Sequence, residues 1–386
     1  MNIGIVCYPT FGGSGVVATE LGKALAKKGH KVHFITYSQP TRLDFFNENL
    51  IYHQVDVMTY PLFQYPPYEL ALASKMVDVV KYEQLEVLHV HYAIPHASAA
   101  YMAKQILATE GIHIPVVTTL HGTDITLVGK DASFTPVVTF SINQSDGISA
   151  VSQDLRDDTY KFFDIKKPIE VIPNFVDLTR FNRQAKEHFK RAICPEGEYL
   201  IVHTSNFRRV KRVEDAIRVF YNVRQQVPAK LLLVGDGPER NSAEKLCREL
   251  GNCTDVRFLG KLDAVEEVLS VSDLFLMPSA KESFGLAALE AMACEVPVIS
   301  SDAGGLPELN IDGETGFVCA VGAVDAMTEK ALYVLHPDNL PTFKKNALAR
   351  AQHFDVSAIV PQYEALYEQV VKQNNRPAVA SSAPTA

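Results

Sequence analysis

The stretch that decides the fold reads Glu282-Ser283-Phe284-Gly285-Leu286-Ala287-Ala288-Leu289-Glu290. It follows Leu274–Met277, a short apolar run of the kind that forms a buried parallel strand. The pair Gly285-Leu286 opens a helical segment, and the first N–H groups of a helix are free to bind an anion such as phosphate. Glu282 precedes this helix and Glu290 lies about a turn and a half inside it. The two carboxylates can accept hydrogen bonds from sugar hydroxyls; the competing interpretations are a surface charge pair with Lys281 and an ordinary helical glutamate.

Strand-like and helix-like segments alternate on both sides of this stretch. The strand-like runs of the first half are Ile3–Cys7, Val32–Thr36, Val87–Val90, Val116–Leu120 and Gly147–Val151. Those of the second half are Leu200–Thr204, Lys230–Val234, Val256–Leu259, Leu274–Met277 and Val296–Ser300. Longer segments with helical periodicity lie between many of them, which is the pattern of doubly wound parallel sheets. The sequence therefore predicts an α/β protein with two Rossmann-like domains that face a cleft.

The length of 386 residues also favours two domains, because a single hydrophobic core seldom grows that large. We place the hinge at Ile172-Pro173-Asn174, since proline ends a strand and the next stretch is irregular. The predicted domains are residues 1–174 and 175–355. The helical pattern Val356–Lys372 is expected to pack back on the first domain, and the tail 374–386, rich in Pro, Ala and Ser, is expected to be disordered.

The composition excludes several classes of protein. The net charge of −8 argues against a general nucleic-acid or anionic-membrane binder. None of the six cysteines forms a C-x-x-C pair, which favours free thiols in a reducing compartment. The amino terminus lacks the basic region and cleavage site of a signal peptide, and no apolar run reaches the ~20 residues that span a bilayer. We expect a cytoplasmic protein without a membrane span.

A glycine-rich turn, Gly12-Gly13-Ser14-Gly15, follows the first predicted strand. Glycines let a ligand approach the backbone, and the helix that starts near Val16 offers free N–H groups. The turn does not fit a dinucleotide site, because its spacing is not G-x-G-x-x-G and the second strand lacks the acidic residue that would hold a ribose. A purely structural turn is the competing interpretation.

Histidines gather after two neighbouring strands of the first half. His121 comes directly after Val116–Leu120 and is followed by Gly122-Thr123-Asp124, while His89, His91 and His96 belong to the preceding strand end. No H-x-x-x-H spacing or adjacent thiolate suggests a metal, so we expect none to be bound. For each histidine a structural role competes with a catalytic one, and we select His121 because glycine and small polar residues follow it.

A basic run, Arg208-Arg209-Val210-Lys211-Arg212, follows the first strand of the second half. A solvated basic face is the ordinary interpretation of such a run. Its position at a strand end in an acidic protein favours a diphosphate site, because arginine binds phosphate through paired hydrogen bonds and lysine adds a mobile charge.

Taken together, these segments resemble the retaining glycosyltransferases of family four, which have the GT-B fold. The resemblance is carried by Glu282 and Glu290, by Gly304-Gly305-Leu306-Pro307-Glu308 and by Gly313-Glu314-Thr315-Gly316, and it covers essentially the whole chain before the tail. Several strings are similar to the members that begin bacillithiol biosynthesis by joining N-acetylglucosamine to L-malate. These strings are Cys7-Tyr8-Pro9, Tyr65-Pro66-Pro67-Tyr68, His91-Tyr92-Ala93-Ile94-Pro95-His96, Leu120-His121-Gly122-Thr123-Asp124-Ile125-Thr126 and Ser205-Asn206-Phe207-Arg208.

The resemblance implies a donor site in the second domain for UDP-N-acetylglucosamine. Glu290 would hold the ribose hydroxyls and Glu282 the hydroxyls of the transferred sugar. The distal phosphate would meet the backbone of Phe284, Gly285 and Leu286, and Gly15 and Asn206 complete the set of predicted donor-binding residues.

Catalysis is expected to rest on charge, because Arg208 and Lys211 would neutralise the departing diphosphate. Many family members carry Gly-Arg with a lysine five residues after that arginine, whereas this chain has Ser205-Asn206 and retains only Lys211. Arg208 is therefore expected to replace the missing cation, with Arg209 and Arg212 as alternatives. With His121 and Glu282, they form the predicted catalytic set.

The acceptor L-malate is expected in the first domain, near Ser14, Tyr92, Thr119 and Asn174. The family's proposed route is front-face attack, in which the leaving phosphate takes the proton of the acceptor hydroxyl. No metal or other cofactor is expected, since Asp-x-Asp is absent after a strand. The alternatives are another acceptor, a nucleotide-sugar epimerase of the same fold and an NAD-dependent oxidoreductase; a homodimer is left open.

Overall fold

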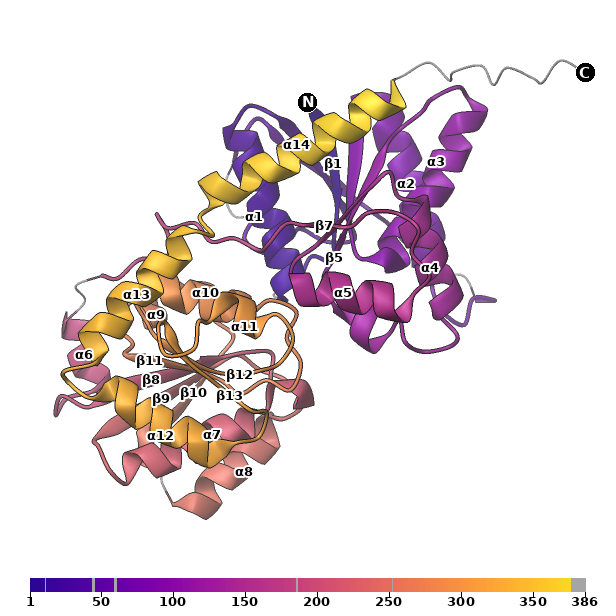
Figure 1. Ribbon diagram of the computed structural model, residues 1–386. Coiled ribbons are helices and arrows are strands. Elements are labelled where there is room, and N and C mark those ends of the chain that lie inside the picture. The colour runs from indigo at the N-terminus through magenta and orange to yellow at the C-terminus, as the bar shows by residue number, and fades with distance from the viewer. Residues whose placement is uncertain (11, 44–45, 59–60, 185–186, 252, 376–386) are drawn as a thin grey trace, which may run out of the picture. The chain divides into compact units, whose positions relative to one another are not determined.

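The computed structural model describes residues 1–10, 12–43, 46–58, 61–184, 187–251 and 253–375 (Figure 1). They form two compact units. Unit 1 contains Met1–Ala150, Asp158–Glu170 and the chain from Val360 onward, and unit 2 contains Val151–Asp157 and Val171–Ile359. Asn174 therefore belongs to unit 2 and not to the first domain, where the sequence analysis placed it. The predicted disordered tail lies, from residue 376 onward, outside the described residues.

Unit 1 is built on a seven-stranded sheet of order β3-β2-β1-β4-β5-β6-β7. Its strands are β1 (Asn2–Val6), β2 (Lys31–Thr36), β3 (Leu50–Gln54), β4 (Val87–His91), β5 (Val116–Leu120), β6 (Gly147–Ala150) and β7 (Glu170–Val171). The strands from β3 to β6 pair in parallel along this order. The five strands predicted for this half are confirmed, and β3 and β7 are additional.

Helices cover both faces of this sheet. They are α1 (Gly13–Lys27), α2 (Tyr68–Glu83), α3 (Ser98–Thr109), α4 (Thr135–Gln144) and parts of α5 (Gln153–Phe162) and α14 (Val356–Asn374). Because strand side chains alternate between faces, Ile35 packs with α2 and α3, whereas Phe34 meets α1 at Gly22. At Gly22 a Cβ atom would lie 2.4 Å from the Phe34 ring, so glycine is required there.

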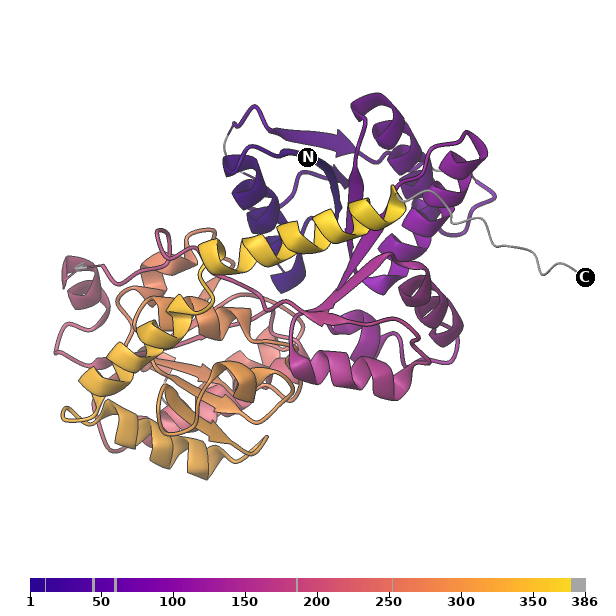
Figure 2. The ribbon, with the colours of Figure 1, turned by 45° about the horizontal axis from the view of Figure 1, so that its top comes forward.

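Helix α14 completes unit 1 from the far end of the sequence. Leu366 and Val370 lie against Gly147 of β6, and Glu364 bonds Lys28 and His30 beside the end of α1. The yellow helix runs alongside the strands of unit 1 in both Figure 1 and Figure 2. Its residues from Val360 onward are grouped with unit 1.

Unit 2 is built on a six-stranded parallel sheet of order β10-β9-β8-β11-β12-β13. Its strands are β8 (Tyr199–Thr204), β9 (Ala229–Val234), β10 (Val256–Gly260), β11 (Leu274–Met277), β12 (Val298–Ser301) and β13 (Gly316–Cys319). The five strands predicted for this half are confirmed, and β13 is additional. Figure 1 shows α7 and α8 on one side of this sheet and α9 and α10 on the other.

The helices of unit 2 follow the predicted alternation. They are α6 (Glu187–Ile193), α7 (Val213–Arg224), α8 (Arg240–Leu250), α9 (Val265–Leu269), α10 (Leu286–Ala293), α11 (Leu306–Leu309), α12 (Val324–Leu335) and α13 (Leu340–Gln352). One core joins the sheet to α7, α8 and α12, with Phe220 and Leu231 among its fully buried members. Among the described residues, no helix is long and apolar enough to cross a membrane.

Candidate active site

The carboxyl end of β11 in unit 2 brings a lysine and a glutamate together. Lys211 ends the short helical turn η3 (Arg209–Lys211) after β8, and its Nζ atom bonds Oε2 of Glu282. The backbone makes this possible, because Ala280 donates an N–H···O bond of 2.7 Å to Val210 and so joins the two loops. Both side chains are about 80% buried, with 19% and 14% of their surface exposed, so the ion pair is largely shielded from water. The predicted sugar-binding carboxylate thus lies against a predicted diphosphate cation.

Helix α10 begins where the sequence predicts. Gly285 has a φ of +101°, a left-handed conformation that favours glycine, and a Cβ atom there would lie 2.7 Å from Leu306. The side chain of Phe284 is buried, and Leu286 is the first residue of the helix. Glu290 lies buried within the same helix, with 6% of its surface exposed. A carboxylate in the second turn of this helix can accept hydrogen bonds from a ligand that reaches it.

Two glycines position the Glu282 loop. Gly304 has a φ of +57°, and a Cβ atom on it would lie 2.0 Å from the Glu282 carbonyl oxygen. Gly305 donates its N–H to the same oxygen at 3.0 Å. Gly304 and Gly305 carry part of the family resemblance, and in the structure both contact the Glu282 carbonyl and so fix the loop that bears this residue.

A second glycine pair supports the loop after β8 and was missed by the sequence analysis. A Cβ atom on Gly235 would lie 1.8 Å from the Ser205 carbonyl, and one on Gly237 would lie 2.0 Å from the Asn206 carbonyl. The backbone that carries the exposed Asn206 therefore packs against the Gly235-Asp236-Gly237 turn after β9. Two glycines flanking an aspartate directly after a predicted strand were the available signal.

The arginines of the basic run differ in their surroundings. Arg212 bonds Asp215 in the first turn of α7, with 2.5 Å between Nε and Oδ2. Arg208 and Arg209 are exposed, and neither forms an ion pair within the part of the chain that the structure describes. Of the three candidates for a diphosphate ligand, Arg208 and Arg209 are thus available and Arg212 is engaged.

In unit 1, the start of α1 meets the residue that follows β4. The hydroxyls of Ser14 and Tyr92 lie 2.7 Å apart, and the Tyr92 N–H donates to the Thr119 carbonyl at 2.9 Å. Gly15 is buried, and a Cβ atom on it would lie 2.5 Å from the carbonyl oxygens of Tyr8 and Thr10. Glycine is thus required at position 15 because these two carbonyl groups of the chain itself lie so close. Three of the four predicted acceptor residues are brought together here, and Asn174 is in unit 2 with its Oδ1 buried.

The histidines of unit 1 form a buried group behind these residues. His91 is the last residue of β4 and His121 follows the adjacent strand β5, and Nδ1 of the first lies 2.8 Å from Nε2 of the second. His89 bonds Thr119 through Nε2 and Tyr367 of α14 through Nδ1, both at 2.7 Å. Thr119 therefore has its side chain in the interior of the sheet, where it also bonds Ser149 at 2.7 Å, so it positions its neighbours.

Burial keeps these imidazoles neutral. It lowers the pKa of His89 and of His121 to about 3 and that of His96 to about 4, and it lowers the pKa of His91 well below its ordinary value. In the part of the chain that the structure describes, the ligand atoms of these four histidines do not converge on one point as metal ligands would. Of these four histidines only His121 is partly exposed, so it alone can hydrogen-bond to a substrate, and a neutral imidazole does not suit anion neutralisation.

Asp124 is the acidic member of this region. Its carboxylate accepts N–H bonds from Ala93 at 2.9 Å and from Gly122 at 3.1 Å, which joins the turns after β4 and β5. Burial raises its pKa to about 6, against the effect of these backbone bonds. The residue thus holds the two turns that present Tyr92 and His121.

Comparisons with known proteins show the family to which the chain belongs. The family described as Glycosyltransferase Family 4 matches residues 11–180, and that described as Glycosyl transferases group 1 matches residues 184–349. A protein of Bacillus anthracis named N-acetyl-alpha-D-glucosaminyl L-malate synthase is 47% identical over 97% of this chain and 98% of its own length. The chain is a family 4 glycosyltransferase.

Solved structures show the fold of this glycosyltransferase in more distant proteins. The sucrose-phosphate synthase of Thermosynechococcus elongatus superposes with a TM-score of 0.79 at 23% identity, over 97% of this chain and 100% of the other. The Anabaena protein HepE, crystallised with UDP and glucose, superposes with a TM-score of 0.80 at 20% identity, over 95% and 99% of the two chains. The glycosyltransferase therefore has the GT-B fold with two parallel-sheet, Rossmann-like domains.

Proposed function

We propose that this glycosyltransferase moves N-acetylglucosamine from UDP-N-acetylglucosamine to the hydroxyl of L-malate, with retention of configuration, as the first step of bacillithiol biosynthesis. The observation that carries the proposal is the 47% identity, over nearly the full length of both chains, to the relative named for this product. The distant structures support the fold alone and say nothing about the acceptor.

The donor would be held by unit 2. Glu290 would accept hydrogen bonds from the ribose and Glu282 from the sugar, while the first N–H groups of α10 would meet the distal phosphate. Lys211 already contacts Glu282, so one cation would link the sugar carboxylate to the diphosphate. Arg208 would add the second positive charge that Ser205-Asn206 cannot supply. As the diphosphate departs, these cations stabilise the charge that develops on it.

The acceptor would be bound by unit 1. Ser14 and Tyr92 offer two hydroxyls 2.7 Å apart, and α1 is fifteen residues long, with free N–H groups at its start. Malate is a dicarboxylate, and a helix start favours negative charge. His121 would orient the malate hydroxyl through a hydrogen bond, in the tautomer that its bond to His91 selects.

The proton of that hydroxyl would leave with the phosphate. A new bond forms between the malate oxygen and the anomeric carbon on the face from which the diphosphate departs, and the bond from that carbon to the phosphate oxygen breaks. The phosphate oxygen then takes the proton of the hydroxyl. The pKa of about 3 at His121 supports this assignment, because so weak a base accepts a proton poorly at neutral pH.

We assign no metal to this transfer, because the lysine, the arginine and the helix start supply the positive charge. The reaction is expected in the cytoplasm, since all six cysteines are free thiols, as in proteins of a reducing compartment.

Mass spectrometry of the reaction products tests the proposal. The full chain is incubated with UDP-N-acetylglucosamine and L-malate, in the presence of EDTA, and the products are examined for UDP and α-linked N-acetylglucosaminyl malate. Parallel reactions replace malate with other hydroxy acids, replace the donor with UDP-glucose, or omit the acceptor. The absence of a malate adduct under conditions where UDP binding is demonstrated would refute the acceptor assignment. Isomerised donor without any acceptor would indicate an epimerase.

A further inference from the structure

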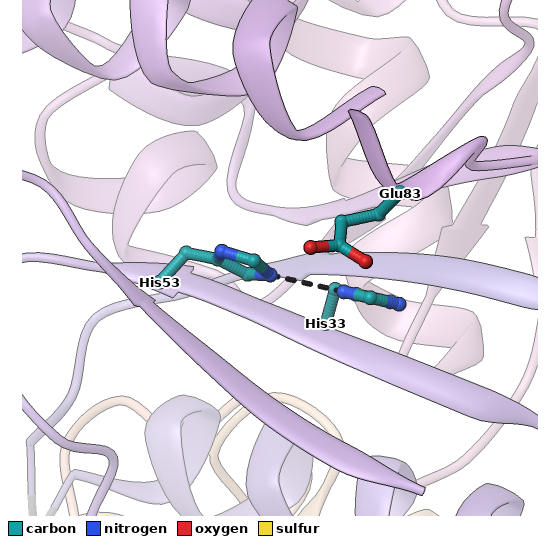
Figure 3. A group of neighbouring side chains, drawn as sticks. All are labelled: His33, His53 and Glu83. Carbon is teal, nitrogen blue, oxygen red and sulfur yellow. Dashed lines mark hydrogen bonds between the residues drawn. The ribbon is translucent and has the colours of Figure 1, made fainter. Parts of the chain in front are cut away.

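Two histidines and a glutamate converge at a place that the transfer reaction does not use. His33 lies in β2, His53 in the edge strand β3, and Glu83 is the last residue of α2 (Figure 3). The pairing of β2 with β3 sets Ile35 opposite His53, so His33 and His53 lie diagonally on one face of the sheet. This is the face on which Ile35 packs with α2. The three side chains therefore meet because of the register of the edge strand and the length of the helix above it.

The distances suit a small metal ion. Nδ1 of His33 and Nε2 of His53 lie 2.9 Å apart, and one ligand atom from each of the three residues lies within 4.8 Å of the others. Zinc bonds of about 2.0–2.1 Å in tetrahedral geometry place two ligand atoms about 3.3 Å apart. A separation of the two rings by a few tenths of an ångström would thus admit the ion. Figure 3 shows the Glu83 carboxylate pointing toward this pair.

The contact between the two rings also suits a metal. Because Nδ1 of His33 and Nε2 of His53 lie 2.9 Å apart, at least one of these nitrogens carries no proton. An unprotonated ring nitrogen is the atom through which histidine ligates a metal. His33 is fully buried, and its Nε2 atom has no hydrogen-bond partner among the described residues. An ion ligated by Nδ1, the nitrogen of His33 that faces His53, would replace the hydrogen bond between the rings and leave Nε2 unchanged.

Glu83 is an exposed carboxylate at the end of a helix, a position where a cation would be favourable. Glu83 ends α2, where the partial charge of the helix is negative and a carboxylate is unfavourable. Within the described part of the chain, no lysine or arginine forms an ion pair with it. A divalent ion would meet the carboxylate and the end of the helix together.

We propose that His33, His53 and Glu83 bind one Zn²⁺ ion, which fastens the edge strand β3 and β2 to the end of α2. Two histidines and one carboxylate are a ligand set that zinc accepts, with water in the fourth position. The site has a stabilising function and is separate from the transfer reaction. Glu83 lies just before β4 begins, whereas Tyr92 and His121 follow the carboxyl ends of β4 and β5. The ion therefore lies away from the carboxyl ends of the strands, where Tyr92 and His121 are found.

Direct metal binding is the first test. The full chain is stripped with EDTA, dialysed and titrated with Zn²⁺ against a chromophoric chelator, without nucleotide or malate, both of which bind metals. We expect one equivalent per chain to bind. The variants His53→Gln and Glu83→Gln should each bind at least tenfold more weakly, and His113→Gln, which alters an exposed histidine of the same unit, should bind like the unchanged protein. Neither His53 nor Glu83 is fully buried, so these variants are better suited than a change at His33.

Cobalt provides a second measurement, because Co²⁺ in a tetrahedral site of nitrogen and oxygen ligands absorbs visible light. The unchanged protein and His113→Gln should show this absorption, and His53→Gln should lose it. Zinc at about 100 times its dissociation constant should raise the melting temperature by about 5 °C, without changing the initial rate of the transferase. Failure to bind one equivalent, or equal binding by His53→Gln and Glu83→Gln, would overturn the proposal. A zinc requirement for turnover itself would also contradict it.

Discussion

The carboxyl edges of the two sheets differ in the kind of side chain that they present. In unit 2 the edge carries charge, with Lys211 against Glu282 and the exposed Arg208 in the neighbouring loop. In unit 1 the edge carries neutral groups, namely the hydroxyls of Ser14 and Tyr92 and, behind them, imidazoles such as His121 whose pKa is far below neutrality. The loops are anchored in similar ways, by backbone bonds and close contacts at glycine.

This difference matches the two halves of the proposed reaction. A departing diphosphate gains negative charge in the transition state, so the groups beside it contribute most when they are charged and already in place. The acceptor hydroxyl needs orientation, and a neutral imidazole in a buried hydrogen bond provides it at little cost in reorganisation. The two edges should therefore respond differently to substitution, to pH and to loss of a hydrogen bond.

The largest effect is expected at the charged edge. Glu282→Ala should lower turnover about 10²–10³-fold, because it removes the carboxylate proposed to bind the sugar and releases Lys211 from its pair. The melting temperature should stay within a few degrees, since the loop is held by backbone bonds from Gly305. The control is Glu249→Ala, in an exposed i,i+4 pair with Lys245, which should leave the rate unchanged. Near-normal turnover of Glu282→Ala would refute the donor assignment.

A smaller and more selective effect is expected at the neutral edge. His121→Gln should lower kcat/KM for malate about 100-fold while UDP affinity, measured by calorimetry, changes less than twofold. The reason is that His121 belongs to unit 1 and would orient only the acceptor, not the donor. His113→Gln is again the matched control. An equal loss of UDP affinity would refute the proposal that unit 2 binds the donor and unit 1 the acceptor.

The buried imidazoles should make unit 1 sensitive to acid. The pKa values of His89, His91, His96 and His121 are lowered by folding, so their contribution to stability is present above pH 6.5 and is lost as the pH falls from about 6.5 to about 3. Each imidazole that stays neutral in the folded protein at pH 5 lowers the free energy of unfolding by about 2 kcal/mol relative to pH 7. Asp124 acts in the opposite sense, since its raised pKa of about 6 favours the folded state as the pH falls from 6 to 4.

Hydrogen exchange followed by mass spectrometry can separate the two units in this respect. Peptides from β4 and β5 should lose more protection between pH 7 and pH 5, after correction for intrinsic rates, than peptides from β8, where His203 is the buried imidazole with a pKa lowered to about 4. Equal losses in the two sheets would count against the assigned protonation states.

The smallest effect concerns α14, the helix that packs against the sheet of unit 1. Tyr367→Phe removes the hydrogen bond of 2.7 Å to His89 and leaves that ring nitrogen unsatisfied. The cost should be about 1–2 kcal/mol, measured as a lower melting temperature with little change in KM for either substrate. Tyr82→Phe is the control, because Tyr82 lies in α2 and is 81% exposed. Equal stability of the two variants would show that this bond does not anchor α14.

The fold was largely predictable because buried parallel strands are continuous apolar runs, and ten of these are confirmed. The exceptions have physical reasons. The strand β3 reads Leu50-Ile51-Tyr52-His53-Gln54 and is only half-buried at the sheet edge, so its sequence lacks the apolar signal. The strand β7 is two residues long. Asn174 was grouped with the wrong unit because a boundary of a few residues has no sequence signal of its own.

The candidate site was predictable in its residue types and not in its pairings. His91 ends β4 and His121 follows the neighbouring strand β5, in which Thr119 pairs with His91. Their contact could therefore have been inferred from the strand order. The contact between Lys211 and Glu282 joins residues 71 positions apart and depends on a backbone bond between two loops. Sequence spacing carries no information about such a bond.

The place of α14 has a consequence for the synthesis of the protein. The ribosome makes the strands of unit 1 first, yet the residues that cover Gly147 and bond His89 come from positions 366–370, near the end of the chain. A growing chain that has completed unit 2 still lacks this cover, so apolar surface of the first domain stays open to solvent until the last turns emerge. Chaperones that bind exposed apolar segments should therefore hold the nascent chain until α14 emerges, and a stop codon before α14 should yield an aggregating product.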